Sequence, residues 1–425
     1  MAACRILYNG IFRFHCTYIK MRRPNKGSSA KLSADSQRLV SYAQAVTQAA
    51  SRLEERGWER LLDALVQKLL KNNHQDAADA ALDELFKQQS GAYDVLIETL
   101  EACSESCRIE HEGQSYDALL IAAPILAWTR FSIASGHISP DMLATLTAHL
   151  YAHVLADGVR LALAPTLFSL DQMPRSHVET LALTQKLAQA ALKGGATKAP
   201  ANAPETAPFL ADTRYLLAAV VVGAGEPLFH WQSEQNFALR ETALEQWRKQ
   251  AEPNLAKLLP GCGLELLLPE AYYVACREAD KRIRPASIHA AVHYLTHALN
   301  VDPSELGAAI GSFSDNQAEG RVDEYRIGFT LQQESEVIYG VVWPLLGEED
   351  ENSRLPVADP AAKTPLETIV SLLQTAGLSQ IREHKERFAM EFCDDCGAPL
   401  YPDLDADLVH AEMPEDVPQA PGHLH

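Results

Sequence analysis

The stretch from Arg214 to Tyr273 constrains the fold more than any other part of the sequence. It opens with the apolar run RYLLAAVVV, continues through a long segment of helical periodicity, and closes with LELLLPEAYY. A run that is apolar at nearly every position predicts a strand buried on both faces, because an exposed face would show alternating polar residues. We interpret the stretch as one strand–helix–strand unit.

Two further segments show a similar order of elements. Residues 117–128 (DALLIAAPILAW) predict a buried strand, the Ser-Pro-Asp sequence at 139–141 begins a helix, and VRLALAPTLF predicts a second strand. A shorter third copy is predicted from strands at 325–331 and 337–343 and a helix after the capping box at 364–367. Each strand and helix is fully buried only when the two pack together, so the hypothesis is three tandem units.

These patterns predict an α/β (or α+β) fold, in which an N-terminal helical layer is followed by repeated strand–helix–strand units forming a mainly parallel or mixed sheet. The expected regions, in chain order, are a disordered basic leader (1–34), a helical region (35–109), the first unit (110–195), a Pro/Ala-rich linker (196–211), the second unit (212–311), the third unit (320–403) and a disordered acidic tail (404–425).

The leader stands apart because it contains seven basic residues and no acidic residue before Asp35. A secretory signal fits poorly, since Arg13, His15 and Lys20 interrupt any apolar core. A transit peptide fits the charge pattern, and an over-long start assignment with Met21 as the true first residue fits equally well. All three interpretations remain open.

The net charge of the chain limits the classes of partner that it is expected to bind. The chain has 37 Lys and Arg against 56 Asp and Glu, a formal net charge of −19, so direct nucleic-acid binding and anionic membrane binding are not expected. No apolar run approaches the roughly 20 residues that span a bilayer. The eight cysteines are scattered, which indicates reduced thiols and a cytoplasmic location. We expect a protein or small-molecule partner, and no feature predicts the oligomeric state.

The sharpest local motif is Cys393-Asp-Asp-Cys396-Gly397, which is typical of a zinc knuckle. Two thiolates at this spacing can face one metal ion, and glycine accepts the positive φ of the turn. His410 is the nearest candidate for a third ligand, and the sequence offers His384, Cys276 or the tail histidines as a fourth. The alternative is a tight turn with two reduced thiols. A thioredoxin-like role is disfavoured because Gly397 and Pro399 do not suit a helix start.

Histidines also recur at helical spacing, at 149 and 153 and again at 289, 293 and 297. Such rows can hold a metal, but an HExxH motif is missing and the histidines flank an apolar stripe. The segment Gly223-Ala-Gly225 follows a strand as a phosphate loop would, yet the third glycine of GxGxxG is absent. Neither pattern therefore predicts a site.

A second candidate site involves residues that follow the two strands of the central unit. His230 lies just after the first strand, and Arg277, Arg282 and Arg284 lie just after the second. If the strands are parallel, these residues meet in one crevice that could receive a small anionic substrate. The alternative is a solvated loop whose arginines pair with interleaved acids such as Glu278.

Three segments together resemble a known family. They are SADSQRLVSYAQAV…SRLEERGWERLLDALVQKLL, AYDVLIETLEACSES and FAMEFCDDCGAPLYP…LVHAEMPED. They are similar to a bacterial family called domain of unknown function 2863, over about residues 32–416, and the closing motif is the most specific. Residues 1–20 depart from the family, which favours a start near Met21. The resemblance implies a bacterial cytoplasmic protein without an assigned activity, and it transfers no catalytic residue.

Two functions follow as hypotheses. The first is a non-catalytic cytosolic binding or regulatory protein whose C-terminus is fixed by zinc at Cys393, Cys396 and His410. The second is an enzyme that acts on a small anionic substrate in the crevice near His230 and Arg277–Arg284.

Overall fold

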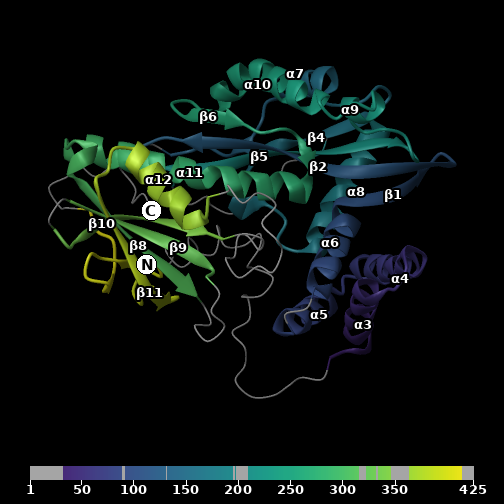
Figure 1. The fold of residues 1–425 in the computed structure, drawn as a ribbon. Helices are drawn as coiled ribbons and strands as arrows, with labels where there is room; N and C mark the ends of the chain where they lie inside the picture. Colours follow the sequence, from purple (N-terminus) through teal and green to yellow (C-terminus); the bar gives the residue numbers. More distant parts are fainter. Residues whose placement is uncertain are drawn as a thin grey trace.

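The structure, a computed structural model, describes residues 32–88, 91–130, 132–194, 197, 209–314, 322–331, 334–345 and 363–413. It contains an N-terminal helical layer, a large sheet with helices on both faces, and a smaller sheet beside it (Figure 1). The expected mixture of helices and strands is therefore confirmed. Residues 1–31 of the predicted leader and residues 414–425 of the predicted tail lie outside the described residues. Residues 404–413, which were expected to be disordered, contain a strand at Leu408–Val409. None of the described helices combines the length and apolar character needed to cross a membrane.

Four helices form the N-terminal layer: α3 (Ala34–Gln48), α4 (Arg52–Lys71), α5 (Gln75–Lys87) and α6 (Ala92–Glu105). Ser33 and Ser51 cap the first two helices by accepting backbone N–H bonds in the first turn. The apolar stripes of all four helices meet in one core with Leu181 of helix α8 (His177–Lys193). The layer is thus joined to the rest of the molecule through α8.

The large sheet has the order β1-β2-β5-β4-β3, and β6 and β7 also pair with β2, on the edge opposite β5. Every strand pair in it is antiparallel. The two long apolar strands lie in its centre, paired from Tyr116 opposite Gly223 to Trp128 opposite Ala211. The strands are β1 (Ser106–His111), β2 (Gln114–Trp128), β3 (Gly136–His137), β4 (Arg160–Ser169), β5 (Ala211–Gly223), β6 (Gly263–Leu266) and β7 (Glu270–Ala271).

The prediction of a mainly parallel or mixed sheet does not hold for the large sheet, for a topological reason. Strand β4 runs parallel to β2 within the first unit, but β5 of the second unit lies between them and runs the opposite way. In the same manner β6 follows β5 in sequence and pairs with β2. The two units interlock, so neighbouring strands come from different units. An apolar run reports burial on both faces and carries no information about the direction of its neighbours.

Helices cover both faces of this sheet. Helices α7 (Pro140–His153) and α10 (Leu239–Leu258) cover one face, and α8 and α11 (Tyr272–Leu299) cover the other (Figure 1). Residues of β2 and β5 alternate between the two cores, with Leu120 and Leu217 on one side and Ile121 and Leu216 on the other. Both faces of the central strands are therefore buried from solvent, as the apolar runs predict.

The second unit ends differently from the prediction. LELLLPEAYY forms only the short strands β6 and β7, and Tyr272 already begins α11. Helix α11 continues through Pro285, and α10 continues through Pro253. A proline inside a helix removes one backbone hydrogen bond, and here the packing of the flanking turns outweighs that loss.

The third copy of the unit is not present as predicted. Its segments belong to a separate sheet of order β10-β9-β8-β11, in which 337–343 lies in the edge strand β10 and only β8 and β11 are parallel. Helices α11 and α12 (Pro365–Thr375) pack on one face of this sheet. Its strands are β8 (Leu306–Ser314), β9 (Glu324–Leu331), β10 (Val337–Pro344) and β11 (Gln380–Ala389).

The opposite face of the small sheet is covered by residues 390–413, which we call the C-terminal strap. The strap contains the two-stranded pair β12 (Tyr401–Pro402) and β13 (Leu408–Val409). Glycines on the sheet let it approach closely: a Cβ atom at Gly340 would overlap the ring of Tyr401, and one at Gly328 would lie 2.5 Å from the carbonyl oxygen of Pro402. This contact places the cysteine motif over the sheet.

Candidate metal centre

A buried arginine of the small sheet holds both ends of the cysteine motif. Arg326 of β9 donates from its guanidinium to the carbonyl oxygens of Glu391 and Leu400, each at 2.7 Å. It also forms a 2.7 Å ion pair with Glu324, and both side chains are 0% exposed. Because these two carbonyls flank Cys393 and Cys396, the arginine fixes where the turn begins and ends.

The turn itself has the hydrogen bonds of a metal knuckle. The N–H of Gly397 donates to the carbonyl of Cys393 at 2.8 Å, and the N–H of Cys393 donates to the carbonyl of Ala398 at 2.8 Å. Gly397 has φ +75°, the conformation for which glycine was expected. The N–H of Ala398 points at Cys396 Sγ, 3.4 Å away. The backbone of the turn therefore curves around the sulfur atoms of Cys393 and Cys396.

Backbone hydrogen bonds also favour the ionised form of the first thiol. The N–H groups of Cys396 and Asp395 lower the pKa of Cys393, and they outweigh the opposing effects of burial and of the Asp395 charge. The thiolate is the form of cysteine that binds metals. The local backbone thus prepares Cys393 as a ligand, although the neighbouring residues are acidic.

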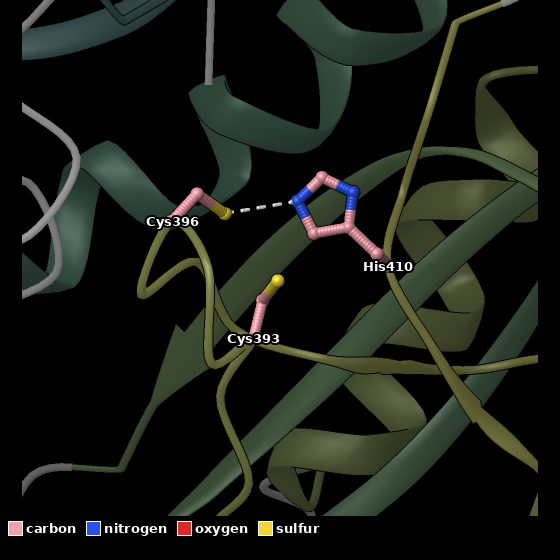
Figure 2. Close-up of side chains that lie close together, drawn as sticks. All are labelled: Cys393, Cys396 and His410. Carbon is pink, nitrogen blue, oxygen red and sulfur yellow. Dashed lines mark hydrogen bonds between the residues drawn. The ribbon is translucent and has the colours of Figure 1, made fainter. Parts of the chain in front are cut away.

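The third candidate ligand comes from the far end of the strap. His410 follows β13 directly, and its Nε2 lies 3.2 Å from Cys396 Sγ (Figure 2). The ligand atoms of Cys393, Cys396 and His410 all lie within 4.8 Å of one another. With Zn–S of about 2.3 Å and Zn–N of about 2.0 Å, the sulfur–nitrogen edge of a tetrahedral site is about 3.5 Å. The observed spacing fits a single ion between the three side chains.

A carboxylate lies behind the histidine. His410 Nδ1 is 3.3 Å from an oxygen of Glu412, whose side chain is 75% exposed, although the two atoms do not form a hydrogen bond. A carboxylate near the distal nitrogen favours the tautomer that leaves Nε2 free to bind a metal. Nε2 is the nitrogen that faces the sulfur atoms (Figure 2).

The other proposed ligands do not join this group. His384 Nε2 lies 2.7 Å from the carbonyl oxygen of Asp403, and Cys276 is buried in a core of the large sheet. The tail histidines His423 and His425 lie outside the described residues. Within the described chain the group therefore offers three candidate ligand atoms, two sulfurs and one nitrogen.

The structure does not bring together the residues of the predicted anion crevice. His230 begins α9 (His230–Ser233), and its neighbours Phe229 and Trp231 pack in the core on the α7 and α10 side of the large sheet. Arg277 and Arg284 belong to α11, which covers the opposite side. The large sheet therefore lies between His230 and the arginines of α11. This separation arises because the strands of the sheet are antiparallel and the arginines lie in a helix.

Those arginines already have partners. Arg277 pairs with Glu101 at 2.6 Å, and Arg282 pairs with Glu278 one turn earlier at 2.9 Å. Arg284 donates to the carbonyl oxygen of Pro344 at 2.8 Å and lies over the ring of Trp343. The interleaved salt bridges that the sequence offered as the alternative are thus present in part, and the anion crevice is not formed.

The histidine rows provide no second metal group in the described part of the chain. His293 and His297 stack at 4.1 Å between ring centroids, and His297 Nδ1 bonds to the carbonyl oxygen of His293 at 2.8 Å. The functional residue that the sequence analysis missed is Arg326. Its signal was the pair Glu324 and Arg326, two charges on one face of an otherwise apolar strand.

Comparison with known proteins identifies a family. No curated protein and no solved structure matches the chain. The family model described as "Protein of unknown function (DUF2863)" matches residues 24–424, which is nearly the whole chain and includes Cys393, Cys396 and His410. This match agrees with the resemblance carried by the opening and closing segments. The chain therefore belongs to the DUF2863 family.

Proposed function

We propose that this protein is a non-catalytic binding or regulatory protein whose C-terminal strap is closed into a loop by a zinc ion. The observation that carries the proposal is the convergence of Cys393, Cys396 and His410 within 4.8 Å of one another. Two thiolates and one imidazole form a ligand set that suits zinc. Calcium and magnesium are not expected here, because both require oxygen ligands.

The position of the centre supports a structural role for the metal. Cys393 and Cys396 lie just after β11, whereas His410 lies at the other end of the strap, after β13. An ion bound to all three would close the strap into a loop, in addition to the contacts that Arg326 makes with its first half. Closing a loop in this way stabilises the folded state because the unfolded chain loses conformational freedom.

Nothing in the described site favours the alternative enzyme hypothesis, because its crevice is not assembled. The partner class that the acidic composition favours is a protein or a small molecule, and we propose a cytoplasmic setting in which the thiols stay reduced.

Metal analysis of the purified full-length protein tests the proposal. We expect close to one zinc per chain, lost in Cys393→Ser and in His410→Ala. Cys262→Ser provides the matched control, because Cys262 is also half-buried and belongs to a different region. Zinc content far below one per chain, or equal zinc content in all three variants, contradicts the proposal.

A further inference from the structure

Strand β1 forms a free edge of the large sheet. It ends the strand order, and among the described residues only β2 pairs with it. It lies at the margin of the molecule, on the side away from the small sheet (Figure 1). An edge strand exposes a row of unpaired N–H and C=O groups, and these groups can pair with a strand of another molecule. The residues of β1 determine which strand fits this edge.

The hydrogen-bond pattern shows which residues of β1 face the edge. The turn at Glu112 and Gly113 has φ +50° and +76°, which is typical of a two-residue type I′ hairpin. Ser115 of β2 accepts the N–H of Ala224 at 3.1 Å, so its backbone groups point to β5 and away from β1. The residue opposite Ser115 in β1 is Glu110. Such a pair is not hydrogen-bonded in an antiparallel ladder, so the N–H and C=O of Glu110 point to the free edge.

The side chains at this edge alternate in character. The backbone groups of Arg108 also face the edge, because every second residue of a strand points to the same side. The side chains of Arg108 and Glu110 lie on one exposed face, whereas Ile109 lies on the other face and packs partly against a core of the large sheet. Arg108 forms a 3.0 Å ion pair with Asp117, yet its side chain is 66% exposed. Glu110 has no ion pair among the described residues.

This pattern is complementary to itself. If Ile109 lies opposite Ile109 of a second copy in an antiparallel pair, Arg108 of each copy lies opposite Glu110 of the other. Both residues present their N–H and C=O groups to the edge, so each pair can exchange two backbone hydrogen bonds. Opposite charges that face each other across two strands stabilise the pairing. The carboxylate of Glu110 thereby gains the partner that it lacks in one copy.

We propose that β1 pairs with β1 of a second copy about a two-fold axis at Ile109, so that two large sheets form one continuous sheet. Charged side chains on an edge strand usually prevent association. Here their order favours one register, because registers centred on either neighbour place Arg108 opposite Arg108 or Glu110 opposite Glu110. The proposal does not depend on the zinc function, since β1 belongs to the large sheet and the metal centre lies on the small one.

Cysteine cross-linking of the full-length protein tests the register. In the proposed pair the Cα atoms at position 109 are about 4.5 Å apart, which suits a disulfide. We expect Ile109→Cys, in a Cys107→Ala background, to join two copies under mild oxidation, with the linked peptides identified by mass spectrometry. Glu110→Cys in the same background is the matched control, because its two Cα atoms would be about 8 Å apart. Equal cross-linking of the two variants, or no disulfide at position 109, overturns the proposal.

Sedimentation velocity measures the association without a cross-link, at about 0.15 M salt, where repulsion between the acidic chains is screened beyond about 8 Å. We expect the parent to dimerise reversibly. Glu110→Lys places like charges opposite each other at two symmetric positions and should weaken dimerisation about tenfold. Arg108→Glu/Glu110→Lys reverses both charges and should restore it. Glu245→Lys, the same charge change on the exposed side of α10, is the control and should dimerise like the parent.

Two results of this measurement overturn the proposal. The first is a parent protein that sediments only as a monomer, which would mean that the charges of β1 protect the edge from association. The second is a dimer that Glu110→Lys weakens no more than Glu245→Lys does, which would place the contact between copies elsewhere on the surface.

Discussion

Replacing Arg326 with methionine should release the C-terminal strap from the small sheet. The substitution removes two hydrogen bonds of 2.7 Å to strap carbonyls and leaves the carboxylate of Glu324 without its arginine. Both side chains are 0% exposed, so water does not compensate for the loss. Removing one partner of a buried ion pair typically costs about 3–5 kcal/mol, which we expect here.

Urea unfolding of the full-length protein, together with hydrogen exchange of residues 390–413, measures both consequences. We expect lower stability and faster exchange of strap amides. The double variant Glu324→Gln/Arg326→Met should recover at least about 1 kcal/mol, because no uncompensated charge is then buried. Arg282→Met is the control, since its ion pair with Glu278 is exposed and should contribute less than about 0.5 kcal/mol.

The reasoning is refuted if Arg326→Met unfolds within about 1 kcal/mol of the parent protein and its strap amides exchange at the parent rate. In that case the strap would be held by its other contacts, and the arginine would not determine where the cysteine turn lies.

Further predictions concern close packing and pH. Gly340→Ala should destabilise the protein by about 1–3 kcal/mol, because the added methyl overlaps the Tyr401 ring, whereas Gly57→Ala in α4 should be neutral or stabilising in the same urea assay. Burial raises the pKa of Glu105 to about 7, so the folded state binds its proton more tightly than the unfolded state does and stability should fall as pH rises from about 4.5 to 7. In the variant Glu105→Gln, stability should fall less over this pH range, and the variant should be more stable than the parent at pH 8. The glutamine side-chain oxygen can still accept the N–H of Tyr273. A pH dependence of stability like that of the parent would contradict the assignment of this fall to Glu105.

The sequence predicts burial well at the centre of the molecule. The runs at 117–128 and 214–222 lie in β2 and β5, the two central strands, because only a strand covered on both faces tolerates apolar residues at every position. The cysteine turn is also predictable, since its spacing and the glycine after it are local requirements. His410 was a candidate because it is the first histidine after the motif.

Features that depend on distant pairing could not be predicted in the same way. The direction of β5 relative to β2 depends on how two units interlock, which leaves no local signature. Strand β8 was missed because its glycines, Gly307 and Gly311, resemble loop residues, although they make room for Thr330 and Phe388. The separation of His230 from the arginines follows directly from the strand directions.

X-ray absorption at the zinc edge of the purified full-length protein tests the central claim most directly. The account predicts bound zinc with two sulfur neighbours at about 2.3 Å and at least one nitrogen neighbour at about 2.0 Å. A protein purified without zinc, or zinc surrounded only by nitrogen and oxygen, would contradict the claim that Cys393, Cys396 and His410 hold this metal.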